Sequence, residues 1–433
     1  MSLETQIKRP RKLPSGFGFG GHIQTSLKGP LDLELPKTPE EFMHRAIVES
    51  MRGVGLTNPN PAVGCLLVQE GQIKAIGSTE KWGGRHAERV AFDALRESGL
   101  SPSGMDAYVT LEPCSHHGRQ PPCSELFKSA GIANLYVATA DPNPLVKGRG
   151  LHFVSNEVQK LHVGLGRTAA VAWNFPFLLQ HQLGRPLIAA KWAQTLDGAF
   201  ADTAGTSQWI TGPEARAHGH WLRLKYDITA VGITTLLQDL PSLTVRDCWR
   251  PHDRQPDVCV IDALGEARAT DPLLRTALEK LSAVAKNRRV ALVTCADKVD
   301  ELKPKIPSSV SVLPLPPLQE SEGAHQHAKS IQRFWTTQAL EDWFGRPVQS
   351  VFVEGGAKLI SLLLEIEAID VCHAFIAPMI LAGDGRRLSR QQIQAPPLSA
   401  ASRFDILSTF LMGDDMLVEL VPRTLSQQFF CEG

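Results

Sequence analysis

The sequence lacks an excess of charge of either sign, and it lacks an apolar run long enough to cross a membrane. Its 433 residues contain 45 Lys plus Arg and 45 Asp plus Glu, which gives a formal net charge of zero. A neutral chain is a poor binder of nucleic acid by bulk electrostatics. The longest apolar run, at 375–381, is much shorter than the roughly 18 residues that a membrane span needs. We therefore expect neither nucleic acid nor a membrane as a partner.

Cysteine is sparse and irregularly spaced. Eight cysteines in a chain of this length, with no secretory signal, favour a reducing compartment over a disulfide framework. We therefore expect a cytoplasmic protein in which any special cysteine is a metal ligand or a catalyst. The hydrophobic content of 43% and the charged content of 21% are typical of a folded chain. They exclude the disordered, collagen-like and coiled-coil classes.

The length predicts two or three domains, because one domain averages about 150 residues. A capping box at Thr38–Glu41, with proline at the first helical position, predicts that the first domain begins near residue 38. A second series of strands begins after Gly184 and Pro186. The predicted division is a poorly ordered tail at 1–37, one domain at 38–184, a second at 185–425 and a C-terminal tail at 426–433.

Strand and helix patterns alternate in both halves, which predicts two α/β domains. The expected strands of the first half are 63–68, 73–77, 108–111 and 135–140, and its expected helices include 86–98 and 123–130. These elements suit a three-layer sandwich. The expected strands of the second half are 187–192, 228–231, 258–261, 290–293 and 351–353. The stretch at 303–322 is rich in Pro, Ser and Glu, which predicts a surface excursion.

Three residues of the kind that bind zinc lie close together in the first half. His86 precedes a predicted helix, Cys114 follows a strand, and Cys123 begins another predicted helix. Catalytic zinc takes three protein ligands and leaves a fourth position for water. Glu88, two residues after the histidine, is suitably placed to move a proton between that water and a leaving group, as in nucleobase deaminases. The pattern predicts hydrolytic deamination.

Other interpretations of this set stay open. A lone cysteine is more often a small buried hydrophobe. In a structural zinc site, His116 or His117 would supply a fourth ligand, but such a site leaves Glu88 unexplained. The common deaminase signature has two residues between its cysteines, whereas eight separate Cys114 from Cys123.

The second half lacks the Gly-x-Gly-x-x-Gly fingerprint of ordinary dinucleotide-binding domains. Its main signal is Gly355-Gly356, which joins a predicted strand to a helix. Free N–H groups at that helix start could bind a phosphate. A plain glycine-rich turn is the alternative interpretation of this motif alone.

Longer motifs resemble a known family. The segments 58–64 (NPNPAVG), 86–88 (HAE), 110–119 (TLEPCSHHGR), 121–123 (PPC), 141–144 (DPNP) and 147–150 (KGRG) resemble the deaminase half of the bifunctional RibD family of riboflavin biosynthesis. Segments 191–198, 207–211 and 239–246 resemble its reductase half. The resemblance implies a cytidine-deaminase-like three-layer domain followed by a dihydrofolate-reductase-like α/β domain.

The resemblance also implies roles for single residues. It implies that His86, Cys114 and Cys123 bind Zn²⁺ and that Glu88 moves the proton. The implied NADPH contacts are Ala193, Trp209, Thr235, Asp239, Gly356, Ala357, Lys358, Leu359, Ile360, Ser361 and Leu362. The implied substrate contacts are Ser207, Arg223, Leu243, Arg246 and Glu354. Two arginines suit a phosphate, and an indole can cover a cofactor face. On sequence alone, Arg223 could instead decorate a helix, and Trp209 could be a core residue.

The family pattern is not met everywhere. Ala199 stands where a basic residue is frequent, and Leu240 stands where a second aspartate is frequent. We expect altered contacts rather than lost activity, because the nicotinamide donates the hydride. Lys191 and Asp197 are pocket candidates without an assigned role.

The sequence thus predicts a homo-oligomeric enzyme with a small-molecule substrate and the cofactors Zn²⁺ and NADPH. It would deaminate 2,5-diamino-6-(5-phosphoribosylamino)pyrimidin-4(3H)-one and then reduce the ribosyl group, giving 5-amino-6-(5-phosphoribitylamino)uracil. One alternative is a nucleic-acid or nucleoside deaminase with a nucleotide-binding accessory domain. The other is a non-catalytic scaffold stabilised by zinc.

Overall fold

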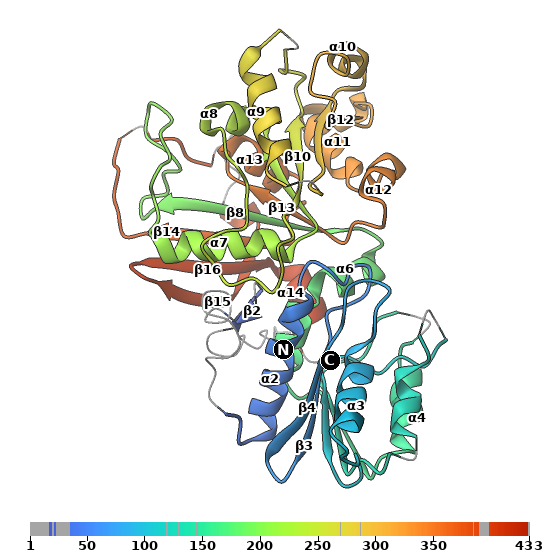
Figure 1. Cartoon of the computed structure of the whole chain (residues 1–433). Helices are drawn as coiled ribbons and strands as arrows, with labels where there is room; N and C mark the ends of the chain where they lie inside the picture. Colours follow the sequence, from blue (N-terminus) through green and yellow to red (C-terminus); the bar gives the residue numbers. More distant parts are fainter. Residues whose placement is uncertain are drawn as a thin grey trace, which may run out of the picture. The chain divides into compact units, whose positions relative to one another are not determined.

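The chain divides into two compact α/β units in a computed structural model (Figure 1). The residues that the structure describes are 17–19, 21–22, 35–117, 120–128, 130–143, 146–268, 270–285, 287–383, 385–388 and 398–431. The N-terminal unit contains the described residues up to Gly184 together with Trp249–His252. The C-terminal unit contains Arg185–Cys248 and the described residues from Asp253 onward.

A five-stranded sheet forms the centre of the N-terminal unit. Its strand order is β4 (Gln72–Ser78), β3 (Gly64–Gln69), β5 (Asp106–Val109), β6 (Asn134–Val137) and β7 (Lys160–Val163). The pairs β4–β3 and β3–β5 are antiparallel, and the pairs β5–β6 and β6–β7 are parallel. The helices are α2 (Pro39–Ser50), α3 (Ala87–Glu97), α4 (Arg149–Ser155), α5 (Arg167–Trp173) and α6 (Phe175–Leu183), with short 3₁₀ helices η2 (Met51–Gly53) and η3 (Cys123–Phe127).

Two glycines let α2 and α3 pack closely on opposite faces of this sheet. A Cβ on Gly64 would lie 1.9 Å from the carbonyl oxygen of Ala46 in α2. A Cβ on Gly77 would lie 2.0 Å from the carbonyl oxygen of Ala87 in α3. Gly77 pairs with Cys65, the neighbour of Gly64 in β3, and successive strand residues face opposite sides. The three-layer arrangement that the sequence predicts is therefore present.

The start of α2 is built as its sequence predicts. The Thr38 side chain accepts a hydrogen bond from the Glu41 N–H, and the Glu41 carboxylate accepts one from the Thr38 N–H. Part of the expected tail at 1–37 is ordered. Phe17–Gly18 (β1) pairs with Gly21–His22 (β2), and Phe17 and Phe19 are buried. The rest of the expected tail up to residue 34 lies outside the described residues.

A nine-stranded sheet forms the centre of the C-terminal unit. The strand order is β12 (Val310–Pro314), β11 (Val290–Thr294), β10 (Asp257–Asp262), β9 (Ile228–Gly232), β13 (Ser350–Glu354), β8 (Leu187–Thr195), β14 (Val371–Ala377), β16 (Asp415–Pro422) and β15 (Phe404–Met412). The strands from β12 to β14 are parallel, and β16 and β15 are antiparallel additions. The parallel strands inside the sheet are buried on both faces, which explains their continuous apolar sequences.

Helices cover both faces of this sheet (Figure 1). They are α7 (Pro213–Lys225), α8 (Ile233–Asp239), α9 (Pro272–Ala283), α10 (Val299–Leu302), α11 (Gln326–Phe334), α12 (Gln338–Phe344), α13 (Ala357–Glu365) and α14 (Arg423–Phe430). Ligands of open parallel sheets bind at the carboxyl ends of the strands. No helix among the described residues is long and apolar enough to span a bilayer.

Three local expectations need correction. The stretch at 303–322 is not only a surface excursion, since it contains β12. As an edge strand, β12 tolerates a proline and partly exposed residues, so its composition resembles a loop. The expected tail at 426–433 is mostly helix α14, in which Phe429 and Phe430 are buried. The helix expected at 123–130 is the shorter η3.

Candidate active sites

His86, Cys114 and Cys123 lie together in the N-terminal unit. His86 is the N-cap residue of α3, Cys114 lies in the loop after β5, and Cys123 begins η3. The His86 Nδ1 atom is 3.6 Å from the Cys114 Sγ atom and 3.4 Å from the Cys123 Sγ atom. All three ligand atoms lie within 4.8 Å of one another. The Cys123 N–H donates to the Cys114 sulfur at 3.3 Å and fixes the turn between the cysteines.

These donors suit a zinc ion. Zinc bonds of about 2.3 Å to sulfur and about 2.0 Å to nitrogen at the tetrahedral angle separate the two atoms by about 3.5 Å. Both nitrogen–sulfur distances are close to that value. Hydrogen bonds from Cys123 and His86 lower the pKa of the Cys114 thiol, so the set already favours a thiolate ligand. Among the described residues, no fourth side chain joins this cluster.

Glu88 lies in the first turn of α3 and is buried. Burial, helped by the charge on Cys114, raises the pKa of Glu88 to about 7. Its carboxyl group lines a cavity of 380 Å³ together with His86 and Cys114. A group that can hold or release a proton at neutral pH therefore faces the same space as the metal ligands.

The two histidines of the alternative structural site differ in position. His116 lines the cavity, whereas His117 is 77% exposed and lies 3.8 Å from Glu125. Neither belongs to the ligand cluster. Gly118 and Arg119, which complete the TLEPCSHHGR motif, lie outside the described residues.

Glu112 holds the loop that forms another wall of this cavity. One carboxylate oxygen accepts the N–H groups of Asp141 and Gly148, each at 3.1 Å. The other oxygen accepts the N–H of Leu151 at 3.1 Å. Glu112 is 3% exposed, so these bonds are shielded from water. The clamp fixes the described part of the loop from Asp141 to Leu151.

Two residues of this loop were not assigned a role from the sequence. Asp141 and Asn143 both line the cavity. Burial, with help from Glu112 and Cys114, raises the pKa of Asp141 to about 6. Both residues belong to the DPNP motif, so the signal was present in the sequence, but no chemistry distinguished it from a turn.

The C-terminal unit has a cavity of 270 Å³ at the carboxyl ends of β8 and β13. Ten of the predicted contacts line it: Ala193, Ser207, Trp209, Arg223, Thr235, Asp239, Leu243, Glu354, Gly356 and Ala357. These residues come from segments more than 160 positions apart in the sequence. The parallel strand order brings them together.

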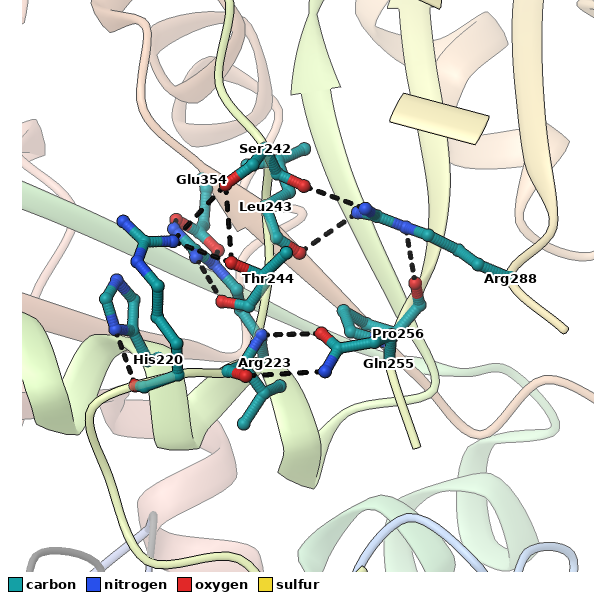
Figure 2. Close-up of polar contacts among 11 residues, drawn as sticks. His220, Arg223, Ser242, Leu243, Thr244, Gln255, Pro256, Arg288 and Glu354 are labelled. Atoms are coloured by element: carbon teal, nitrogen blue, oxygen red, sulfur yellow. Dashed lines mark hydrogen bonds and ion pairs between the residues drawn. The ribbon is translucent and has the colours of Figure 1, made fainter. Parts of the chain in front are cut away.

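Opposite charges meet inside this cavity. Arg223 forms a bidentate ion pair with Glu354, with nitrogen–oxygen distances of 2.5 and 2.9 Å (Figure 2). Burial opposes ionisation of Glu354, but the charges of Arg223 and Lys191 lower its pKa. Lys191 is the register partner of Glu354 on β8, and burial lowers the pKa of its ammonium group. Arg223 is therefore more than a surface residue of helix α7.

Trp209 is a surface residue, so the interpretation of it as a core residue is wrong. Its side chain is 63% exposed. The guanidinium carbon of Arg216 lies 4.5 Å from the centre of the indole ring. The indole thus has one supported face and lines the cavity, as an aromatic cover for a cofactor requires.

A larger cavity of 590 Å³ continues beside the first one. It is lined by the start of α8, the end of β10 and the start of α13. Thr235 and Gly356 line both cavities. Gly355 and Gly356 have φ values of 65° and 54°, and a Cβ on Gly356 would lie 2.5 Å from the Thr235 hydroxyl oxygen. Only glycine permits this approach, so the two cavities suit an extended dinucleotide.

Some predicted contacts lie elsewhere. Lys358, Leu359 and Leu362 line the larger cavity, but Ile360 and Ser361 do not. Those two residues point away on the buried side of α13. Arg246 does not itself line the smaller cavity, but it belongs to the same loop as Leu243, which does, and its guanidinium group donates to the Thr244 hydroxyl of that loop at 2.7 Å. Ile360 and Ser361 stay predicted contacts that neither cavity lining includes.

Both residues that depart from the family pattern have local structural roles. Ala199 is fully buried, and its N–H donates to the Thr195 hydroxyl. Leu240 ends α8 in the left-handed conformation with φ 44°, and its carbonyl accepts the Lys280 ammonium at 2.6 Å. Asp197, which had no assigned role, accepts the N–H groups of Leu381 and Ala382. It thus fixes the loop after β14.

Two family models match the chain. The cytidine and deoxycytidylate deaminase zinc-binding region matches residues 36–139, and the RibD C-terminal domain matches residues 186–418. The expected fold classes of the two halves are confirmed.

Full-length relatives match as well. The riboflavin biosynthesis protein RibD of Actinobacillus pleuropneumoniae is 35% identical over 386 residues, which is 89% of this chain and 95% of the relative. RibD of Escherichia coli K12 is 33% identical over 88% of this chain and 99% of the relative. A solved structure of a diaminohydroxyphosphoribosylaminopyrimidine deaminase/5-amino-6-(5-phosphoribosylamino)uracil reductase from Thermotoga maritima covers 88% of this chain and 98% of its own, with 30% identity and a TM-score of 0.71.

Proposed function

The chain belongs to the RibD family of bifunctional riboflavin-biosynthesis enzymes, and we propose that residues 38–184 carry the deaminase and residues 185–425 the reductase. The enzyme deaminates 2,5-diamino-6-(5-phosphoribosylamino)pyrimidin-4(3H)-one hydrolytically with zinc. It then reduces the ribosyl group with NADPH to give 5-amino-6-(5-phosphoribitylamino)uracil. The observation that carries the division is the presence of one zinc-type donor set with Glu88 in the N-terminal unit and a dinucleotide-sized pair of cavities in the C-terminal unit.

In the deaminase site, His86, Cys114 and Cys123 would hold the zinc ion. When bound, zinc lowers the pKa of a coordinated water and so supplies a nucleophile at neutral pH. Glu88 takes the proton from the nucleophile and delivers it to the departing amine. Asp141 and Asn143 offer hydrogen bonds to the pyrimidine, and the Glu112 clamp keeps them in place.

In the reductase site, the two cavities would hold NADPH, which when bound supplies the hydride. Ala193, Trp209, Thr235 and Asp239 would contact the cofactor from the smaller cavity. Gly356, Ala357, Lys358, Leu359 and Leu362, at the start of α13, would contact it from the larger cavity.

The substrate occupies the part of the reductase site with paired charges. Arg223 and Arg246 bind its phosphate through charge-assisted bonds. Ser207 and Leu243 contact the rest of the substrate. Glu354 and Lys191 present opposite charges to the polar groups of the substrate.

We also propose a cellular location, a substrate class and an oligomeric state for the enzyme. All eight cysteines lie in the described part of the chain and none forms a disulfide, which supports a cytoplasmic location. Zero net charge supports a small-molecule substrate without nucleic acid. Ile406 and Leu411 are exposed on the edge strand β15, which supports a homo-oligomer. Sedimentation of the purified protein tests that last point.

Mass spectrometry of products tests the function. The purified protein is incubated with the diaminopyrimidine phosphate, with and without NADPH. We expect the deaminated ribosyl compound without NADPH and the ribityl compound with it. Deamination of RNA but not of the diaminopyrimidine phosphate would instead support the nucleic-acid deaminase. Turnover of neither RNA nor the diaminopyrimidine phosphate would support the zinc-stabilised scaffold.

A further inference from the structure

Three arginines converge on one short loop beside the reductase cavity. The loop at 242–246 follows α8 and carries Leu243 and Arg246. Arg223 donates to the Thr244 carbonyl at 2.7 Å, and Arg246 donates to the Thr244 hydroxyl at 2.7 Å. Arg288 reaches the loop from the opposite side (Figure 2). Arg223 and Arg246 have a role in the proposed function, whereas Arg288 has none.

Among the described residues, the hydrogen bonds of the Arg288 side chain all go to backbone carbonyl groups: two in the loop, one at Pro256 and a long one of 3.5 Å to Leu281 in α9. Its Nη1 group donates to the Ser242 carbonyl at 2.7 Å and its Nη2 group to the Leu243 carbonyl at 3.0 Å. Its Nε group donates to the Pro256 carbonyl at 3.1 Å, just before β10. One planar guanidinium group therefore ties the loop to the start of the inner strand β10.

The side chain of Arg288 is buried, and burial of a charged group costs free energy. It is 6% exposed, and burial together with the charge of Arg223 lowers the pKa of its guanidinium group to about 10. It therefore stays charged at neutral pH, without a carboxylate among its hydrogen-bond partners in the described residues. A buried charge is tolerated when its hydrogen bonds are satisfied. Here two of them go to carbonyls of the loop, and the others go to the carbonyls of Pro256 and Leu281.

The loop needs support because its backbone is strained. Leu243 has a φ of 47°, in the left-handed region that residues other than glycine rarely adopt. This conformation directs the buried Leu243 side chain to the cavity wall. Gln255 adds a second clamp, since its side chain accepts the Val245 N–H at 2.7 Å and donates to the Val245 carbonyl at 3.3 Å (Figure 2).

We propose that Arg288 is a positioning residue for the reductase: it holds the 242–246 loop so that Leu243 keeps the cavity wall and Arg246 stays beside Arg223 to bind the substrate phosphate. The inference rests on the proposed function of Arg223 and Arg246. It adds a residue that touches neither substrate nor cofactor. Loss of the Arg288 side chain should weaken substrate binding and leave NADPH binding unchanged, because the start of α13 forms the NADPH cavity.

The test compares Arg288→Met with Arg289→Met in the full-length enzyme. Arg289 is a matched control, because it is the adjacent arginine but donates to the carbonyls of Trp343 and Phe344 instead of the loop. The reductase KM for the deaminated substrate, its kcat and the Kd for NADPH are measured, and the deamination rate of each preparation reports the active concentration. Arg246→Ala is measured in parallel as the phosphate-ligand variant.

We expect Arg288→Met to raise the substrate KM on the order of tenfold or more, because small displacements of binding groups are costly. Its kcat at saturation and its NADPH Kd should stay within about twofold of the parent values, and Arg289→Met should change neither. Arg288→Lys should be intermediate, since an ammonium group cannot serve three carbonyls in a planar fork.

Two results would overturn the inference. In one, Arg288→Met keeps the parent KM while Arg246→Ala raises it. In the other, Arg288→Met weakens NADPH binding as much as substrate binding, which a general loss of structure would cause. If Arg246→Ala has no effect on KM, the phosphate ligand itself is misassigned and the inference falls with it. Should Arg288→Met not fold, Arg288→Lys and Gln255→Leu carry the same test, with smaller expected rises in KM.

Discussion

The two units build their active sites in opposite ways. In the N-terminal unit the zinc-type donors and Glu88 lie between residues 86 and 123, and one short stretch of sequence supplies the chemistry. In the C-terminal unit the cavity residues extend from Lys191 to Arg386 and meet only because the strands are ordered in parallel. The difference follows from the tasks, since a metal-assisted hydrolysis acts at one point whereas an extended cofactor needs a long groove.

Each unit also uses a buried charged side chain to hold a loop at its cavity, and the signs are opposite. Glu112 accepts three backbone N–H groups of the 141–151 loop. Arg288 donates to the carbonyls of Ser242 and Leu243. A carboxylate can only accept hydrogen bonds and a guanidinium group can only donate them. The 141–151 loop therefore directs backbone N–H groups at Glu112, and the 242–246 loop directs carbonyl groups at Arg288.

Removal of zinc should separate the two units most strongly. Dialysis against a chelator should reduce deamination to background, because the metal lowers the pKa of the water and Glu88 alone cannot replace that effect. Reduction of the deaminated substrate should persist, since the reductase cavities contain no metal-ligand cluster among the described residues. Both rates are measured before and after zinc is restored. Loss of both activities together would show that the units are not functionally separate.

The Glu112 clamp predicts a smaller, equally one-sided effect. Glu112→Gln places an amide group opposite backbone N–H donors and leaves part of them unsatisfied in a buried place, at a cost of about 1–3 kcal/mol. We expect deamination to fall about tenfold, with zinc content and reduction unchanged. Glu125→Gln is the control, because it makes the same substitution on an exposed glutamate of η3. Equal rates in the two variants would contradict the role of the clamp.

Much of the zinc site could be predicted, because its ligands are chemically distinctive and close in sequence. His86, Glu88, Cys114 and Cys123 meet as the motif implies. The clamp role of Glu112 could not be predicted, although Glu112 lies in the same motif. Its partners are backbone N–H groups some 30 to 40 residues away, and the sequence does not distinguish these groups from those of other residues. Arg288 was missed for the same reason.

The central strands were predictable from their continuous apolar runs, but the edges of the large sheet were not. The pattern of β12 is interrupted by exposed residues and Pro314, because an edge strand is only partly buried. Ile360 and Ser361 show a different limit. Successive side chains of a helix point in different directions, so a continuous block of residues does not line a cavity as a whole.

The smallest expected difference between the two units is in their stability at acid pH. Burial lowers the pKa of His218 to about 3, although the nearby Glu419 opposes this. The unfolded chain binds this proton near pH 6.5 and the folded chain only near pH 3, so the C-terminal unit loses stability as the pH falls between those values. Asp141, with its raised pKa of about 6, acts in the opposite direction in the N-terminal unit. One such group changes the unfolding equilibrium by at most about tenfold per pH unit.

Hydrogen-exchange mass spectrometry of peptides from β16 and β3 between pH 6.5 and 4 checks this prediction, after correction for the intrinsic exchange rate. We expect the protection of β16 to fall earlier, and His218→Phe, beside the ring of Phe375, to delay that fall. A β16 peptide whose protection is as insensitive to pH as that of β3 would count against the assignment.

The central claim is that Glu88 and its zinc ligands serve one reaction and the C-terminal cavities the other. The most direct test is product mass spectrometry of Glu88→Gln, with zinc content measured on the same sample. The variant should keep its zinc, lose deamination by a factor of about 10²–10⁴, and reduce the supplied deaminated substrate with NADPH at the parent rate. Deamination at the parent rate, or a loss of reduction in the zinc-loaded variant, would contradict the account.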